Sequence, residues 1–149
     1  MSEIRKMKRG DLDQVLLIEE ASFSSSWSRK MFEEELDAEN SKYYVLNDTN
    51  NKNRVIGYCG IKMILDEGHV MTIAVKENER GKGKGAELAR KLIDIATKFS
   101  IATLFLEVRQ TNYTAINLYE KMKFEKITLR SKYYQDNNED AIIMALKLR

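Results

Sequence analysis

A glycine-rich basic turn is the segment of this sequence whose residue types most clearly predict chemistry. It reads Arg80-Gly-Lys-Gly-Lys-Gly85 and lies between a predicted strand and a predicted amphipathic helix. Glycines let backbone N–H groups point inward together because no Cβ interferes, and a helix start adds unpaired N–H groups with a partial positive charge. Together with the three cations, this pattern favours a phosphate or pyrophosphate site. The alternative is a solvated basic turn that only caps the helix.

Two common phosphate motifs fit this turn poorly. A P-loop needs Ser or Thr directly after its Gly-Lys pair, and each Gly-Lys pair here is followed by glycine. Gly81, Gly83 and Ala86 match the dinucleotide fingerprint, and Glu107 lies about 20 residues beyond. In that fingerprint, however, the glycine turn directly follows its strand and begins a series of parallel βαβ units, and this sequence shows neither feature. A nicotinamide-dependent oxidoreductase is therefore the minority interpretation.

Periodicity and turn residues predict the elements that position the glycine-rich turn. Strands are expected over 3–7, 43–46, 55–65, 69–75, 103–108, about 124–132 and about 140–148. Helices are expected to begin at Asp11, at Ser28, after the glycine-rich turn and at Asn112, and Asp66-Glu-Gly68 is predicted as a turn. The resulting order indicates an α/β (α+β) domain around a central mixed, mostly antiparallel sheet of about seven strands, flanked by about four helices.

The composition excludes several classes of protein. With 149 residues the chain fits one domain, 1–149. One Cys and one His argue against a disulfide and against a metal site built on those residues. A net charge of +2 does not indicate a nucleic-acid binder, and no apolar run is long enough for a membrane span or a signal peptide. We therefore expect a cytoplasmic domain, a monomer or weak dimer, that needs no metal, nucleic acid or membrane.

Several spaced motifs together resemble the GNAT acetyltransferases. Arg80-x-x-Gly83-x-Gly85, after the strand 69–75, resembles that family's acetyl-CoA loop. The residues that look like its second signature are Leu106-Glu-Val-Arg109, Asn112, Ala115, Leu118-Tyr-Glu120 and Phe124. The C-terminal segment, with Lys132-Tyr-Tyr-Gln135, Asn138-Glu-Asp-Ala141 and Met144, looks like the N-terminal acetyltransferase branch, which includes ribosomal-protein alanine acetyltransferases and archaeal arrest-defective-type enzymes. The resemblance covers nearly the whole chain.

This resemblance implies a fold, a reaction and roles for individual residues. It implies the GNAT fold and transfer of acetyl from acetyl-CoA to the N-terminal α-amino group of proteins. Ribosomal proteins are among the acceptors that the resemblance suggests. Residues implied to bind acetyl-CoA are Ile73, Ala74, Val75, Arg80, Gly81, Lys82, Gly83, Lys84, Gly85, Ala86, Asn112 and Tyr119. Residues implied to line the acceptor are Phe23, Trp27, Tyr133 and Tyr134. The sheet is expected to splay between the strand ending at Val75 and the strand ending near Val108, and acetyl-CoA would enter that gap.

Acetylation of an α-amino group requires only a modest general base. The reference pKa is near 7.7–8.0 for an α-amino group and near 10.4 for Lys, so deprotonation at pH 7 costs about 1 kcal/mol for the first and about 4–5 kcal/mol for the second. Direct attack in a ternary complex is favoured over a covalent intermediate. Cys59 lies inside the strand 55–65 and is better explained as a small buried hydrophobe than as a nucleophile.

Three residues are candidates for proton transfer. Glu107 is the first candidate base, directly or through a water, because it lies near a strand end where ligands gather in open α/β sheets; the alternative is an ion pair with Arg109 or another surface cation. His69 is the second, because its pKa range suits neutral pH, although a plain surface residue fits equally well. Tyr119 is the candidate acid for the departing thiolate, and its ring also fits the core.

Other functions fit parts of the same pattern. Within the same class, the acceptor could be a lysine side chain or a small-molecule amine. A non-catalytic CoA- or nucleotide-binding module would keep the glycine-rich turn without acetyl transfer.

The sequence also departs from the family at two places: Lys84 fills a slot that is often aliphatic, and the loop Phe23 to Trp27 lacks a proline that many relatives carry. The second departure leaves the acceptor's side-chain preference open.

Overall fold

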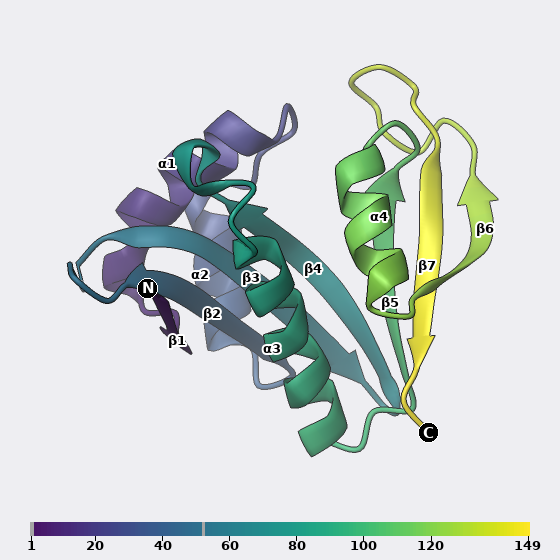
Figure 1. Cartoon of the computed structure of the whole chain (residues 1–149), viewed down its shortest axis with the longest axis horizontal. Helices are drawn as coiled ribbons and strands as arrows, with labels where there is room; N and C mark the ends of the chain where they lie inside the picture. Colours follow the sequence, from purple (N-terminus) through teal and green to yellow (C-terminus); the bar gives the residue numbers. More distant parts are fainter. Residues whose placement is uncertain (1, 52) are drawn as a thin grey trace.

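The computed structural model describes residues 2–51 and 53–149, and over these residues seven strands form one sheet that four α-helices cover (Figure 1). The strands are β1 (Ser2–Lys6), β2 (Ser41–Asp48), β3 (Val55–Ile64), β4 (Glu67–Val75), β5 (Thr103–Arg109), β6 (Glu125–Arg130) and β7 (Ala141–Lys147). The helices are α1 (Leu12–Ser22), α2 (Arg29–Asp37), α3 (Lys84–Lys98) and α4 (Tyr113–Lys121), with the short 3-10 helices η1 (Arg9–Asp11) and η2 (Glu77–Glu79). The predicted mixed α/β fold is confirmed.

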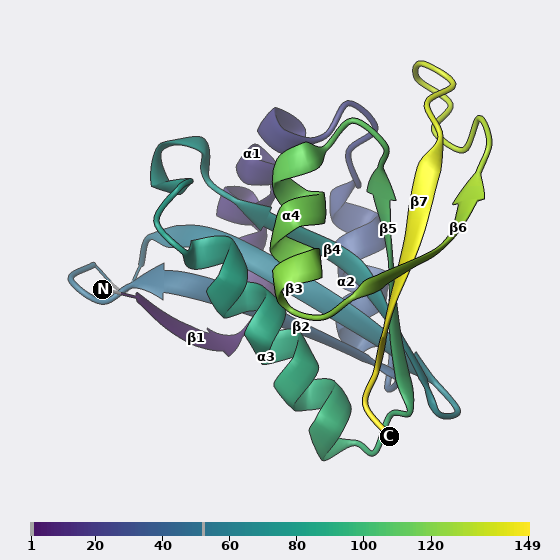
Figure 2. The same cartoon turned by 45° about the vertical axis from the view of Figure 1, so that its right-hand side comes forward.

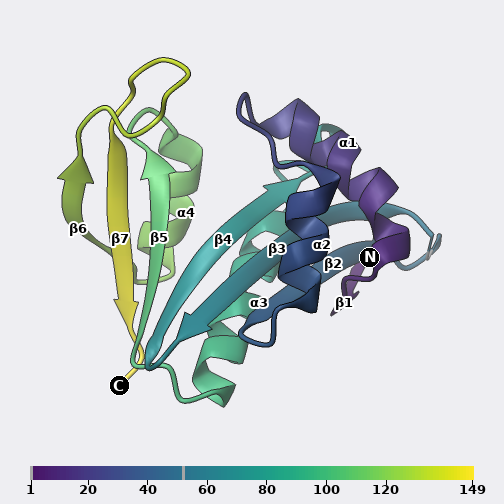
Figure 3. The ribbon, with the colours of Figure 1, turned by 180° about the vertical axis from the view of Figure 1, so that it is seen from behind.

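The sheet contains one parallel pair of neighbouring strands, β4 and β5. Its order is β1-β2-β3-β4-β5-β7-β6, and every neighbouring pair is antiparallel except the parallel pair β4–β5. That parallel ladder is short: only residues 67–69 pair with residues 103–105. Beyond it the two strands diverge, so that β1–β4 and β5–β7–β6 form two wings that meet at one end (Figures 1 and 3). The splay expected from the sequence is present at this position.

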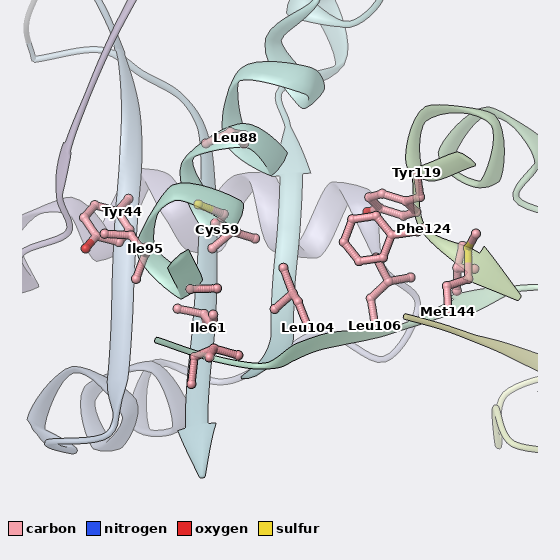
Figure 4. Close-up of a cluster of buried hydrophobic side chains, with 14 of the residues drawn as sticks. Tyr44, Cys59, Ile61, Leu88, Ile95, Leu104, Leu106, Tyr119, Phe124 and Met144 are labelled. Carbon is pink, nitrogen blue, oxygen red and sulfur yellow. The ribbon is translucent and has the colours of Figure 1, made fainter. Parts of the chain in front are cut away.

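Helices pack on both faces of the first wing. α3 lies on one face of β2–β4 while α4 packs beside β5, as Figures 1 and 2 show; α1 and α2 cover the opposite face (Figure 3). The apolar side of α3 presents Leu88, Ala89, Leu92, Ile95 and Ala96 at helical spacing, and all are buried. They join side chains of both wings in one cluster, which extends to the rings of Tyr119 and Phe124 (Figure 4). A second cluster joins α1 and α2 to the sheet.

Local capping signals predict the N-cap positions of three helices, and at two of them the side chain makes the cap hydrogen bond. The Ser28 hydroxyl accepts from the Met31 N–H (3.2 Å), and the Asn112 side chain accepts from the Ala115 N–H (3.3 Å). The prediction that Asp11 is the N-cap of α1 is right in position, but the Asp11 side chain makes no cap hydrogen bond. Because η1 precedes α1, Asp11 already has helical backbone angles, and its carboxylate accepts instead from the Lys8 N–H at 2.8 Å and binds the Arg5 guanidinium at 2.7 Å.

The predicted turn at Asp66-Glu-Gly68 begins earlier than expected. Leu65, with φ 55°, and Asp66 make the turn, and β4 begins at Glu67. Gly68 is needed for another reason. A Cβ there would lie 3.1 Å from a side-chain carbon of Leu104 and 3.2 Å from one of Ile61. The close approach of β4 and β5 where the wings meet therefore depends on the missing side chain.

This packing makes Gly68 sensitive to enlargement. Gly68→Val should lower the free energy of unfolding by about 1–3 kcal/mol, because overpacking forces neighbouring side chains and backbone to shift. Urea unfolding of the purified variant measures the change. Gly10→Val is the matched control: no atom lies within 4 Å of a Cβ at Gly10, so its cost should stay within about 0.5 kcal/mol. Equal stability of the two variants would show that the junction tolerates a side chain.

Candidate active site

The divergence of β4 and β5 opens a cavity of about 450 Å³. Its lining comes from α1 and the loop after it, from β4, from β5 and the start of α4, and from the loop between β6 and β7. These loops lie at the open end of the splay (Figure 1). The predicted site residues that line the cavity are Phe23, Trp27, Ile73, Glu107, Asn112, Tyr119, Tyr133 and Tyr134. Segments at opposite ends of the chain thus contribute to one site.

The cavity has two chemically different sides because side chains of a strand alternate between faces. Leu106 and Val108 of β5 belong to the apolar cluster under α3, together with Tyr119 of α4. Glu107 and Arg109 alternate with them and face the loops of the other side. The site therefore has an apolar side and a polar side that meet in the gap between the strands.

Glu107 lies on the polar side, and of the alternative ion pairs it forms the one with another surface cation, Arg130, and not the one with Arg109, which pairs with Asp136 and Glu139. Its carboxylate accepts a hydrogen bond from the Tyr133 hydroxyl, and this bond is the main cause that raises the pKa of that phenol. The nearest cation is Arg130, whose Nη1 lies 3.9 Å from Oε1 of Glu107. The side chain of Arg130 is more than half exposed. The carboxylate is thus held by a tyrosine and by a long, exposed ion pair, and it stays partly accessible from the cavity.

Tyr119 lies on the apolar side with its ring buried. It packs edge-on against Phe124, with 5.8 Å between ring centroids. Burial raises the pKa of its hydroxyl well above the usual value, so the phenol stays protonated near neutral pH. A protonated hydroxyl at the cavity wall can donate a hydrogen bond, and both predicted features, ring packing and cavity contact, are present.

His69 lies away from the cavity lining. It belongs to the three-residue ladder with β5, its ring stacks on Phe105 with 5.4 Å between centroids, and its Nε2 is 3.2 Å from Oε1 of Glu67. The residues that follow it in β4, Val70 to Ile73, line the cavity. Of the two predicted bases, the structure brings only Glu107 to the gap between the strands.

β4 has an open edge next to the cavity. Past His69 it no longer pairs with β5, while on its other side Ile73, Ala74 and Val75 pair with β3. The ladder with β3 also contains a bulge: Thr72 pairs with Gly60 and Val70 with Ile61, which leaves Met71 as the extra residue. Such bulges redirect backbone and side chains beside active sites. Apart from the Val75 carbonyl, which accepts from Arg80, the backbone groups of this edge are not paired with another strand and can meet a ligand.

The glycine-rich turn lies beside the end of β4 and begins α3. Gly81 and Gly83 have φ 77° and 78°, and no atom lies within 4 Å of a Cβ at either position. Gly83 is the N-cap of α3, with a left-handed conformation that non-glycine residues rarely adopt. The turn therefore presents an uncovered backbone at a helix N-terminus, where N–H groups suit an anion.

The three cations of this turn are held by protein groups. The Arg80 guanidinium donates to the Val75 carbonyl at 2.9 Å and to the Ser22 hydroxyl at 3.1 Å. Lys82 pairs with Glu79 at 3.7 Å. The sequence suggested that these cations surround a phosphate, whereas in the structure Arg80 and Lys82 contact other groups of the protein.

Lys84 is held in the same manner. Its ammonium donates to the Ser2 hydroxyl at 3.0 Å and lies 3.7 Å from Glu87, and its side chain is only 13% exposed. Backbone amides and the helix start, rather than lysine side chains, are thus the groups of the turn that are best placed to receive an anion.

The acceptor side contains a buried carboxylate that the motifs did not single out. Glu19 of α1 lines the cavity and is 2% exposed. It accepts from the Tyr58 hydroxyl at 2.5 Å and from the Trp27 N–H at 3.0 Å, and burial raises its pKa despite these bonds. It anchors the loop that follows α1. Its place on the apolar side of the predicted first helix, next to Ile18, is the sequence signal that could have revealed it.

The rings expected at the acceptor side also line the cavity. Trp27 packs against Phe32 with 5.1 Å between ring centroids, so it serves both the core and the cavity wall. Tyr133 and Tyr134 pack edge to face at 5.1 Å, and the Arg109 guanidinium lies 4.0 Å from the centre of the Tyr134 ring.

Comparison with known proteins supports a family assignment. Residues 12–124 match the acetyltransferase (GNAT) family. The chain belongs to this family. It is 36% identical over 151 residues to the [ribosomal protein bS18]-alanine N-acetyltransferase of Escherichia coli, covering 99% of each chain. It is 30% identical to an N-alpha-acetyltransferase of Sulfolobus acidocaldarius, covering 98% of this chain and 92% of that protein. The crystal structure of the Escherichia coli enzyme superposes with a TM-score of 0.89, covering 99% of this chain and 94% of that one.

Membership of the GNAT family confirms the resemblance found in the motifs, the acyltransferase class and acetyl-CoA as the acetyl donor. The dinucleotide interpretation of the glycine-rich turn is wrong, because the sheet around it is antiparallel apart from the short β4–β5 ladder. Within the described ranges 2–51 and 53–149, no group of three or more His, Cys, Asp or Glu is placed to hold a metal ion. In that same part of the chain, no helix has the length and hydropathy to cross a membrane.

The role of the glycine-rich turn can be tested at its helix cap. Gly83→Val should abolish acetyl-CoA binding measured by calorimetric titration, because a β-branched side chain both disfavours φ 78° and covers the N–H groups. Lys82→Gln is the matched variant in the same turn and should weaken binding by less than about 10-fold, because Lys82 is a surface cation paired with Glu79. Intact binding in a folded Gly83→Val protein would contradict the amide cradle.

Proposed function

We propose that this chain transfers the acetyl group of acetyl-CoA to the α-amino group of protein N-termini. The observation that carries the proposal is the two-sided cavity in the splay, which places the open edge of β4 and Tyr119 on one side of the gap and Glu107 on the other. Two relatives of at least 30% identity over nearly the whole chain carry names of enzymes that act on protein N-termini, one of them on ribosomal protein bS18.

The donor fits the side of the site near α3. Amides of Gly81 to Ala86 at the start of α3 would hold the pyrophosphate. The edge of β4 from Ile73 to Val75 would bind the pantetheine amides; the Val75 carbonyl already accepts from Arg80, which fixes the turn to the strand. Asn112 and Tyr119, both in the cavity lining, would border the thioester end.

The acceptor fits the opposite side. Phe23, Trp27, Tyr133 and Tyr134 supply aromatic surface around the polar side of the gap. An extended chain end entering between the two loops would present its α-amino group to Glu107.

The proton steps follow from the side chains on the two sides. Glu107, directly or through a water, takes a proton from the acceptor ammonium, whose neutralisation at pH 7 costs only about 1 kcal/mol. The amine nitrogen then forms a bond to the acetyl carbon as the carbon–sulfur bond breaks, the second amine proton leaves to solvent, and the thiolate takes up a proton. Tyr119, kept protonated by burial, donates a hydrogen bond to the departing sulfur. His69 has no part in this scheme because it lies outside the cavity lining.

A covalent path through Cys59 does not fit the site. The thiol is fully buried in the core cluster and burial raises its pKa, which keeps it as a neutral thiol. Direct attack in a ternary complex is the path that the cavity supports.

Glu107→Gln tests the base. It should lower kcat by about 100-fold or more while the dissociation constant of acetyl-CoA stays unchanged, because Gln keeps the shape and loses the proton acceptor. Steady-state kinetics and calorimetric titration measure the two quantities. Glu125→Gln, an exposed acidic position on β6, is the matched control and should behave as the wild type. A Glu107→Gln enzyme with wild-type turnover would show that another group is the base.

A pair of peptides tests the acceptor class. Both peptides carry one internal lysine, and one has a free and the other a formylated N-terminus. The enzyme with acetyl-CoA should acetylate only the free peptide, at its α-amino group, as mass spectrometry of fragments shows. Acetylation of the blocked peptide at lysine would favour the lysine acetyltransferase, and binding of acetyl-CoA without transfer to either peptide or to small amines would favour the non-catalytic module. The cytoplasmic location and the monomer or weak dimer stay predictions.

A further inference from the structure

A charged junction joins the two loops that border the acceptor side. The first loop follows α1 and includes Ser24; the second lies between β6 and β7 and includes Asp136. The Ser24 hydroxyl donates directly to the Asp136 carboxylate, although the two residues are 112 positions apart in sequence. These loops lie on opposite wings of the sheet, so this contact bridges the open end of the splay (Figure 1).

Arg109 lies at the centre of this junction. Its Nη2 binds Asp136 at 2.9 Å and reaches the Ser24 hydroxyl at 3.4 Å. Its Nη1 binds Asn137 at 3.2 Å and Glu139 at 3.4 Å. The planar guanidinium thus uses its fork of donors to connect both loops at once, which the single ammonium of a lysine cannot do.

The second loop is fastened to β5 on its other side as well. The Glu139 carboxylate accepts from the N–H of Thr111 at 2.8 Å and from its hydroxyl. Its side chain is 13% exposed, so Glu139 is held firmly by the protein and is not a freely solvated carboxylate. The hydrogen bonds from Thr111 lower the pKa of Glu139, and those from Ser24 and Arg109 lower the pKa of Asp136, so both carboxylates remain charged near neutral pH.

The same guanidinium also supports an aromatic wall of the cavity. It lies over the Tyr134 ring at 4.0 Å, and Tyr134 in turn packs against Tyr133, whose hydroxyl donates to Glu107. A path of contacts therefore runs from Arg109 through the two tyrosines to the carboxylate of the proposed base. Arg109 itself is not needed for proton transfer in this scheme.

We propose that Arg109 is the positioning residue of the acceptor side: it holds the Ser24 and Asp136 loops together and sets the aromatic wall against which the acceptor chain binds. This inference rests on the proposed function, because it assigns Arg109 to acceptor binding and not to donor binding. The donor side, at the start of α3, makes no contact with this junction in the part of the chain that the structure describes.

Kinetics with a free-N-terminus peptide and acetyl-CoA test this role. Arg109→Ala should raise KM for the peptide by about 10- to 100-fold, the range expected for losing hydrogen bonds to charged groups, while the dissociation constant of acetyl-CoA stays unchanged and kcat changes by less than about 3-fold. Arg109→Lys should rescue part of the loss, because one ion pair can survive. Arg9→Lys is the control, since it alters another short surface ion pair, Arg9–Asp37, at 2.7 Å, which lies outside the junction.

Amide hydrogen exchange supplies a readout that does not need the reaction. In Arg109→Ala, exchange should speed up over residues 23–28 and 131–140 together, while the strands keep wild-type protection and the melting temperature stays close to that of Arg9→Lys. An unchanged peptide KM, or a fall in melting temperature with weaker acetyl-CoA binding, would overturn the proposal. If the wild type acetylates no peptide, the proposed function fails, and exchange confined to the two loops still decides whether Arg109 holds them.

Discussion

The short parallel ladder between β4 and β5 is the constraint on which the rest of the site depends. Within the sheet, three residue pairs join the two wings, and Gly68 eases this contact because a side chain there would press on Leu104 and Ile61. Since the strands separate directly afterwards, the edge of β4 loses its neighbour and the cavity opens at that point. A longer ladder would pair that edge and close the gap, so the ligand site is built from hydrogen-bonding groups that the sheet leaves free.

The charges of the site are used mainly to hold the protein's own segments in place. Arg80 ties the glycine-rich turn to the end of β4 and to α1, and Lys84 ties the start of α3 to Ser2. Arg109 ties two loops across the open end of the splay. In the proposed scheme, the donor is then bound by backbone N–H groups and the acceptor amine meets the carboxylate of Glu107. This division lets a nearly neutral chain bind an anionic donor without a large free positive patch.

Much of the fold follows from local sequence, and the site follows only in part. The helix caps at Ser28 and Asn112 and the glycine-rich turn depend on neighbouring residues, so their patterns predict them. Asp11 is the N-cap of α1, as predicted, but its side chain makes no cap hydrogen bond because its carboxylate binds Arg5, which comes from a different element. The partners of Arg109 could not be predicted, since they lie far away in sequence and meet only when the wings are assembled. His69 shows the same limit: its residue type suits a base, but the ladder register places it where the strands are still joined.

Ligand-induced protection from amide exchange tests the central claim, that the splay is the donor site, most directly. A second cavity, about 630 Å³ and largely apolar, lies between α1 and η2 and is lined by Leu17, Ile18 and Ala21 among others. It is larger, but it contains none of the predicted site residues in the described part of the chain. Exchange with and without acetyl-CoA should show new protection at Ile73–Val75 and Gly81–Ala86 and none at residues 14–21. Protection over residues 14–21 with no change at β4 and the glycine-rich turn would contradict the account.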